Sequence, residues 1–269
     1  MNAPERAELA GPAARVAGVA LNPSPGWTGV LREQVAAVWL SLRYERMILW
    51  GVALFLTLVS VWEQASGGAA GVPFTPRAGI AAAVALLVPL EVWRGEGPAR
   101  RDYHRAMPLG HGAHAAARSA AGLVWTLAGV AAFFAWLGLL SFATGGGVDE
   151  FEAWQWVAPF AGATVVYLLG SAVALVAAHP WRWLGGALSG YLFLDTLRGM
   201  GPADTLLNGW DAALTGPYGL TTVLTGLVRD MNYSHREVPD ARAWLVGTGL
   251  WMALSISLFA WAACRQPER

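Results

Sequence analysis

Ionisable side chains beside the long apolar stretches are few, and two carboxyl groups come with a counter-charge at helical spacing. Glu91 precedes Arg94 by three residues, and Asp195 precedes Arg198 by the same step. Residues three apart share one face of a helix, so each spacing predicts a structural ion pair. An ionisable residue near the end of a membrane span is also a candidate for a proton relay. For both carboxyl groups the adjacent Arg favours the structural interpretation.

Histidine and cysteine give little basis for a metal site. His111 and His114 form an H-x-x-H pair, with His104 nearby. A zinc-binding helix instead places two His four residues apart with a Glu between them, and no Glu stands at that place. The single cysteine, Cys264, allows neither an internal disulfide nor a cysteine metal cluster. The sequence therefore predicts no metal site and no cofactor on this chain.

Lysine is absent, since all 18 basic residues are Arg. A P-loop needs a Lys to reach the β- and γ-phosphates of a nucleotide, so a standard ATP-hydrolysing site is excluded, and Schiff-base chemistry with it. An intramembrane enzyme would need paired carboxylates, a Ser/His pair or a metal cluster facing each other. Glu91 and Asp195 instead fall at opposite predicted membrane faces. We therefore expect no catalytic residue and no enzyme activity, with an intramembrane enzyme as one alternative.

Hydroxyl side chains lie within two of the apolar stretches. Thr126 is in one, and Thr164, Tyr167 and Ser171 are in the next. They are accompanied by glycines, and small residues allow membrane helices to pack closely. Close packing is the main role that we assign to the small residues. The four hydroxyl side chains are also candidates to line a transport pathway.

The elements that carry these residues are predicted to be membrane-spanning helices. Hydrophobic residues make up 55% of the 269 residues and charged residues only 13%, about half the usual share in a soluble domain. About 20 apolar residues suffice to cross a bilayer. The fold class that we expect is therefore an all-α integral membrane protein with a single transmembrane domain over residues 27–264. Its six spans are expected at about residues 47–62, 78–93, 119–142, 154–178, 183–197 and 243–263.

Several segments are expected to lie outside the hydrocarbon. Residues 27–46 have apolar side chains at three- and four-residue steps, which indicates an amphipathic helix lying in the interface. The alternative is an ordinary surface helix packed on protein. Residues 1–26 are interpreted as a flexible N-terminal tail and residues 265–269 as a C-terminal tail. A long external loop is expected over residues 199–241. Within it, the uncharged segment 212–228 is interpreted as a re-entrant or interfacial piece because its Gly, Pro and Thr residues suit a lipid-facing helix poorly.

The arginines predict the orientation. With the N-terminus in the cytoplasm, 13 of the 18 Arg fall on the cytoplasmic side and 5 on the outside. Cytoplasmic loops carry the excess of basic residues in membrane proteins. Both termini are therefore expected in the cytoplasm. The zero formal net charge implies no nucleic-acid partner.

The most basic segment, residues 94–118, joins the second and third expected spans on the cytoplasmic side. Gly97 and Pro98 break the chain, and Pro108 with Gly110 ends any helix begun after them. A short charged helix over about 99–107 is expected between these breaks. It is too small to be a domain and is well suited to dock into another protein. The other interpretation is a cluster of charges that only sets the topology.

This segment resembles the corresponding region of type-2 ABC transporter permeases. Those subunits have a basic E-x-G-x…L-P-x-S-R…R pattern between their second and third spans. The matching features here are Arg94-Gly95, a basic helical turn, Met107-Pro108-Leu109 and Arg118. The chain departs from the pattern at Gly110-His111, where the family often has Ser-Arg. The resemblance covers about residues 27–264 and includes six spans, the amphipathic N-terminal helix and the long loop before the last span.

The resemblance implies a permease subunit that forms half of a translocation pathway, in an exporter of the bacterial inner (plasma) membrane. It implies two copies of a separate ATPase subunit that bind ATP and Mg, and a second permease subunit, which we expect to be identical. The short cytoplasmic helix would then contact the ATPase. The residues implied in that contact are Arg100, Arg101, Tyr103, His104, Arg105 and Pro108. A membrane anchor or assembly subunit without a transport pathway is the other alternative.

Overall fold

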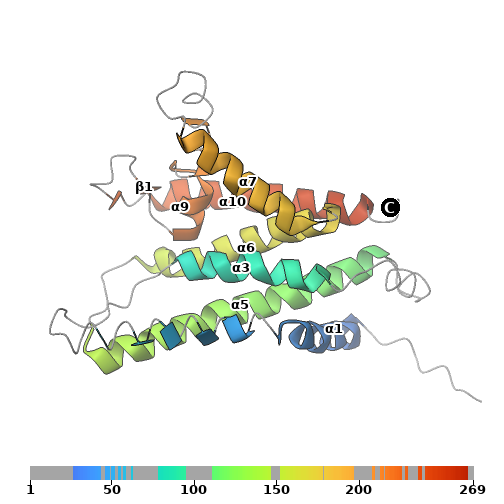
Figure 1. The fold of residues 1–269 in the computed structure, drawn as a ribbon, viewed down its shortest axis with the longest axis horizontal. Coiled ribbons are helices and arrows are strands. Elements are labelled where there is room, and N and C mark those ends of the chain that lie inside the picture. Colours follow the sequence, from blue (N-terminus) through green and yellow to red (C-terminus); the bar gives the residue numbers. More distant parts are fainter. Residues whose placement is uncertain are drawn as a thin grey trace, which may run out of the picture.

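The structure is a computed structural model of a helical chain (Figure 1). It describes residues 27–43, 46–48, 50–51, 54–55, 57–58, 62, 78–94, 111–146, 152–177, 179–196, 208–209, 213–214, 216–225, 228–229, 236–237 and 240–265. The helices are α1 (Trp27–Ser41), α3 (Ala78–Arg94), α5 (His111–Thr144), α6 (Ala153–Val176), α7 (Pro180–Thr196), α9 (Leu220–Thr225) and α10 (Ala241–Arg265). Two short strands, β1 (Val228–Arg229) and β2 (Arg236–Glu237), pair antiparallel between α9 and α10, with Val228 opposite Glu237.

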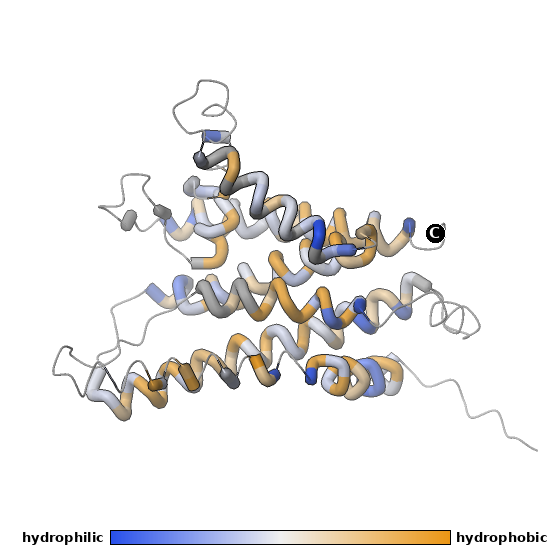
Figure 2. Tube along the Cα trace, viewed as in Figure 1, coloured by the Kyte–Doolittle hydropathy of each residue, from blue (hydrophilic) through white to orange (hydrophobic). Residues whose placement is uncertain are grey.

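Three helices in the described part of the chain have the length and apolar composition needed to cross a membrane. They are Gly112–Thr144 within α5, α6 and α10. Apolar residues dominate the middle of these helices, while hydrophilic residues gather at the ends of α3, α7 and α10 (Figure 2). The helices fit the expected membrane protein, and they coincide with the spans expected at 119–142, 154–178 and 243–263.

The helices α3, α5 and α6 form the centre of the fold. α6 packs against α3 on one side and α10 on another, and α5 packs against α1 and α3. α5 runs opposite to α3 and α6, so the end of α3 and the start of α5 lie at the same end of the bundle (Figure 1). α1 lies beside α5 near this end, and α9 lies at the opposite end, against α6 and α10.

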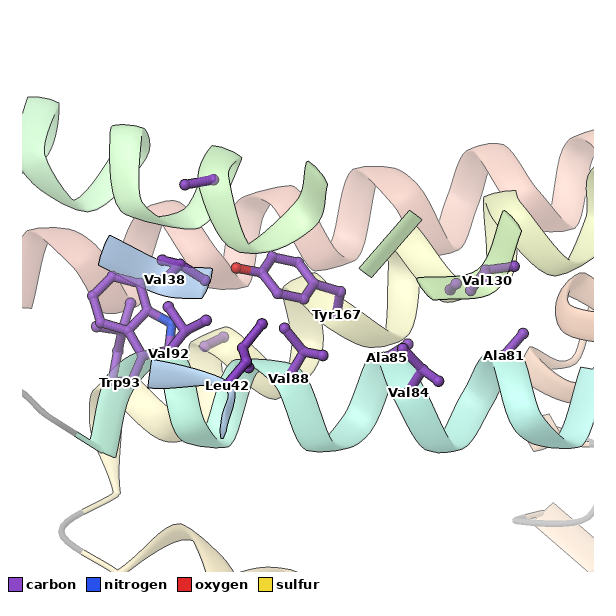
Figure 3. Close-up of a cluster of buried hydrophobic side chains, with 14 of the residues drawn as sticks. Val38, Leu42, Ala81, Val84, Ala85, Val88, Val92, Trp93, Val130 and Tyr167 are labelled. Carbon is purple, nitrogen blue, oxygen red and sulfur yellow. The ribbon is translucent and has the colours of Figure 1, made fainter. Parts of the chain in front are cut away.

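A core of buried side chains joins α1, α3, α5 and α6, with one contribution from α10. Val38 and Leu42 enter it from the α1 segment, Val84 and Val88 from α3, and Tyr167 from α6 (Figure 3). Small residues allow the close approach. A Cβ atom on Gly170 of α6 would lie 2.8 Å from the ring of Pro89 on α3, so the two helices meet where a side chain is missing.

Local sequence signals account for the end of α5 and the start of α6. Gly145 has a φ of +69°, the left-handed conformation with which glycine commonly ends a helix. Gly146 then donates its N–H to the Ser141 carbonyl at 2.8 Å. At the start of α6, the Glu152 N–H is bound by the Gln155 side chain at 2.8 Å, half of a capping box.

The start of α5 differs from the expected span boundary. The helix begins at His111 rather than Ser119, so residues 111–118 of the expected 94–118 loop are helical and α3 ends at Arg94. Alanine, the strongest helix former, occupies four of the positions from 113 to 117, and it carries the helix past the end of the apolar stretch. With 34 residues, α5 is about 51 Å long, which exceeds the ~30 Å hydrocarbon core.

Other expected elements are present with shifted ends. α1 covers the first 15 residues of the expected 27–46 helix, and Leu42 lies in a turn after it. α3 and α7 correspond to the segments expected at 78–93 and 183–197. Within the expected span 47–62, the described residues are helical. α9 lies inside the segment 212–228, and together with β1 and β2 it gives structure to parts of what was expected as an external loop.

Candidate functional site

The described residue with the most informative contacts near the basic segment is Arg118. It lies near the start of α5 and is only 8% exposed. Its Nε and Nη2 atoms both donate to the Val92 carbonyl, at 2.9 and 2.6 Å. Val92 belongs to the last turn of α3, where carbonyl groups have no donor from their own helix. A cation is also favoured at a helix C-terminus, so Arg118 caps α3 from a neighbouring helix.

The next residue along α5 connects to a third helix. Tyr167 of α6 is completely buried, and its hydroxyl donates to the Ser119 carbonyl at 2.9 Å. The ring fits because position 122 is glycine, as a Cβ atom there would clash with the Tyr167 hydroxyl and lie 3.0 Å from Val92. Val92, Arg118, Ser119, Gly122 and Tyr167 therefore form one contact region, which we name the Arg118 junction. It joins α3, α5 and α6 at the end of the bundle nearest the basic segment.

The candidate pathway residues lie in or near this packing. Thr126 and Ser171 are completely buried, as is Tyr167, whereas Thr164 is partly exposed. Thr126 donates to the Gly122 carbonyl at 3.0 Å, and Thr164 donates to the Phe160 carbonyl at 2.9 Å. These hydroxyls are thus bonded to their own helices, as is common for Thr in membrane helices. Their role in lining a pathway stays a prediction.

Glu91 and Arg94 lie together at the end of α3. Arg94 Nη1 lies 2.8 Å from Glu91 Oε1. The Arg94 side chain is 68% exposed and that of Glu91 is 10% exposed, so the pair lies at the edge of the packed region. Asp195 lies in α7, but Arg198 is outside the described residues, and the second expected ion pair stays a prediction.

The residues implied in ATPase contact are outside the described part of the chain. They are Arg100, Arg101, Tyr103, His104, Arg105 and Pro108. The residues that flank this segment, Arg94 and His111, are described and end or begin a helix. His114 lies in α5 and is partly exposed. Within the described ranges, no group of three or more His, Cys, Asp or Glu side chains could hold a metal ion.

α1 is anchored to α5 by aromatic contacts that the sequence pattern did not indicate. The Trp125 indole N–H donates to the Val35 carbonyl at 2.8 Å. Trp125 also stacks on Trp39, with ring centroids 4.3 Å apart. The Arg46 guanidinium lies over the Trp39 ring, 3.9 Å from its centroid. These contacts attach α1 to the side of α5, about two turns beyond the Arg118 junction.

At the other end of the bundle, α9 is seated on α6 and α10. Thr222, Val223 and Leu224 are buried, and a Cβ atom on Gly162 of α6 would lie 2.6 Å from the Leu224 backbone. Two indole N–H groups of α10 donate to carbonyls of this segment, Trp244 to Val223 at 3.2 Å and Trp251 to Tyr218 at 2.9 Å. These contacts to α9 and to Tyr218 before it are therefore made to backbone atoms, and such contacts leave no pattern in the sequence of the segment itself.

The arrangement has no counterpart among the proteins with which it was compared. No protein-family model, no curated protein and no solved structure matches this chain.

Proposed function

We propose that this chain is the transmembrane permease subunit of an ATP-binding-cassette exporter in a bacterial inner membrane. It forms half of the translocation pathway and pairs with a second, identical permease subunit. ATP and Mg bind to two copies of a separate ATPase subunit. The basic segment between α3 and α5 makes the ATPase contact, with Arg100, Arg101, Tyr103, His104, Arg105 and Pro108 at the interface.

The observation that carries the proposal is the Arg118 junction. Arg118 binds the Val92 carbonyl at 2.9 and 2.6 Å. The end of α3 and the start of α5, which flank the basic segment, are therefore hydrogen-bonded to each other. The 16 residues between Arg94 and His111 therefore begin and end at one fixed place, which suits docking on a partner and transmitting force. A cluster of charges that only sets the topology needs no such contact between the two flanking helices.

The proposed topology has six spans, and the described charges support it. The end of α3, the start of α5, the start of α7 and the end of α10 lie at one end of the bundle (Figure 1), which we assign to the cytoplasm. These helix ends carry Arg94, Arg118, Arg182 and Arg265. At the other end, the starts of α6 and α10 and the β1–β2 pair carry both signs of charge, with Glu152, Arg229, Arg236, Glu237, Asp240 and Arg242. Both termini are then cytoplasmic. α1, with Arg32 and Glu33 exposed and Val38 buried against the bundle, is the interfacial helix. α9 belongs to a re-entrant segment that reaches the outer ends of α6 and α10.

Copurification with ATPase subunits encoded beside its gene tests this function. The tagged chain is co-expressed with them and purified from detergent, beside a variant that combines Arg100→Glu, Arg101→Glu and Tyr103→Ala. The matched control carries Arg229→Glu and Arg242→Glu, which change two arginines on the proposed outer side. We expect the wild type and the control to retain the ATPase and the first variant to lose it while inserting normally.

Two results would contradict the proposal. If no ATPase copurifies with the wild type, the transporter assignment fails, and the membrane-anchor and intramembrane-enzyme alternatives replace it. If the first variant binds the ATPase as well as the control does, the assignment of the basic segment as the contact fails.

A further inference from the structure

The Arg118 guanidinium is buried, and this burial requires an explanation. Removing a charged group from water is costly unless the group is paired and hydrogen-bonded. Arg118 is 8% exposed and directs two nitrogen atoms at one backbone carbonyl of another helix. A basic residue needed only for topology would be expected in solvent or among lipid headgroups, as Arg94 is on the adjacent helix, where its side chain is 68% exposed.

The acceptor of the Arg118 hydrogen bonds, the Val92 carbonyl, belongs to the C-terminal end of α3. Val92 is two residues from the end of α3, and its carbonyl is among the last four, which lack helical partners. The partial negative charge at a helix C-terminus strengthens a hydrogen bond from a cation. The bond therefore fixes the position of the last turn of α3 relative to the first turns of α5, although Val92 and Arg118 are 26 residues apart.

A second bond extends the connection to α6. Tyr167 donates to the carbonyl of Ser119, the residue directly after Arg118. Consecutive residues of α5 thus bind α3 through a side chain and α6 through a backbone atom. Gly122, one helical turn further on, keeps the space that the Tyr167 ring needs. Together these contacts join three helices at the Arg118 junction.

We propose that Arg118 is a positioning residue that makes the end of α3, the start of α5 and α6 respond as one unit to force on the basic segment. This proposal rests on the proposed function for the source of that force, because the ATPase supplies it. The connection among the three helices itself is a property of the chain alone and can be tested without the ATPase.

The first experiment measures amide hydrogen exchange of the full chain in lipid nanodiscs. Arg118→Met removes the donors while keeping a long side chain, and Arg118→Lys restores one donating cation. Arg94→Met is the matched control, because it removes an Arg from the same helix end without touching the bond to Val92. In Arg118→Met we expect amide exchange in the last turn of α3 to be about tenfold faster than in the wild type. Arg118→Lys should give a smaller increase. In Arg94→Met the exchange rate should change by less than about twofold.

Unchanged exchange in Arg118→Met would overturn the connection, whatever the partner of the chain is. Should Arg118→Met fail to insert, Arg118→Lys and Tyr167→Phe still decide the matter. Each weakens one bond of the junction, and wild-type exchange at the junction in both would equally overturn it.

The second experiment measures the response to nucleotide in the complex with the ATPase. Exchange is compared with and without a non-hydrolysable ATP analogue. In the wild type we expect the analogue to change exchange in the end of α3, the start of α5 and α6 around Tyr167 together. In Arg118→Met we expect the ATPase to copurify, the α3 response to be lost and Arg118→Lys to restore it in part. A uniformly destabilised protein would instead shift exchange equally in both nucleotide states.

The outcomes separate the two proposals. If the wild type binds no ATPase, the proposed function fails, and the first experiment alone decides whether the three helices are connected. If the ATPase binds and the coordinated nucleotide response persists in Arg118→Met, the proposed function stands and the positioning role of Arg118 is wrong.

Discussion

The hydroxyl group of Tyr167 occupies the space that any side chain at position 122 would need. This hydroxyl donates to the Ser119 carbonyl at 2.9 Å. A Cβ atom on Gly122 would clash with the hydroxyl and lie 3.0 Å from a methyl group of Val92. Tyr167 is completely buried, so its ring is enclosed by the neighbouring helices. The absence of a side chain at Gly122 is thus what lets α3, α5 and α6 meet at one place.

Gly122→Ala should therefore destabilise the chain, although alanine is the better helix former. Forcing a methyl group into a packed core typically costs about 1–3 kcal/mol, and we expect a lower Tm in detergent by intrinsic Trp fluorescence. Gly112→Ala on the same helix is the control, because no atom lies within 4 Å of its Cβ position. An equal effect of the two substitutions would show that packing at Gly122 is not limiting.

Tyr167→Phe should cost less than Gly122→Ala and should partly rescue it. Losing one hydrogen bond between membrane helices costs about 0.6–2 kcal/mol. Removing the hydroxyl also removes the atom nearest to the new methyl group, so the double variant should lose less stability than the sum of the two single variants. A double-mutant cycle on Tm measures this coupling. Strict additivity would mean that the methyl group and the hydroxyl do not compete for space.

Gly162→Ala should displace α9 from α6. The new Cβ atom would lie 2.6 Å from the backbone of Leu224, and a backbone atom cannot move aside as the end of a side chain can. We expect faster amide exchange across residues 216–225, while the Arg118 junction at the other end of the bundle keeps its wild-type exchange. Gly249→Ala, which meets no atom within 4 Å, is the control. Equal exchange in the two variants would contradict the seating of α9 on α6.

Glu91→Gln should change stability little. Its partner Arg94 is largely exposed, and ion pairs in contact with water contribute about 0–1 kcal/mol. We expect a Tm shift smaller than that of Arg118→Met, where a buried contact is lost. A proton-relay role would instead appear as a transport defect in Glu91→Gln at unchanged Tm, once a substrate is known. That result would replace the structural interpretation of this pair.

The sequence predicted those features that depend on composition. α6 and α10 lie within two residues of the spans expected at 154–178 and 243–263, because uncharged apolar stretches of this length form helices in membranes. The start of α5 was missed because the expected boundary followed hydrophobicity. Alanines at positions 113 and 115–117 continue the helix without contributing much apolar surface.

The contacts that build the site were beyond the reach of the sequence for a different reason. Arg118 was noted as one of the features that match the permease pattern, but its acceptor is the Val92 carbonyl, a backbone atom with no sequence signature. The same holds for Trp125 and Val35, and for Trp244 and Val223. The segment 212–228 was expected to suit a lipid-facing helix poorly. The short helix α9 within it is packed against α6 and α10, where the indole N–H group of Trp244 and the absence of a side chain at Gly162 support it from outside its own sequence.

Cys264 offers a direct test of the proposed orientation. It is the one cysteine of the chain, and it is exposed at the end of α10, which we assign to the cytoplasm. A membrane-impermeant maleimide should therefore label it in inverted vesicles but not in intact cells. The matched variant combines Cys264→Ser with Asp240→Cys, which moves the thiol to an exposed position just before the other end of the same helix and should reverse the pattern.

Labelling of Cys264 from outside would place the C-terminus outside, and with it the Arg118 end of the bundle. The basic segment would then lie on the side of the membrane that an ATPase cannot reach, so this labelling result alone would rule out the proposed transporter.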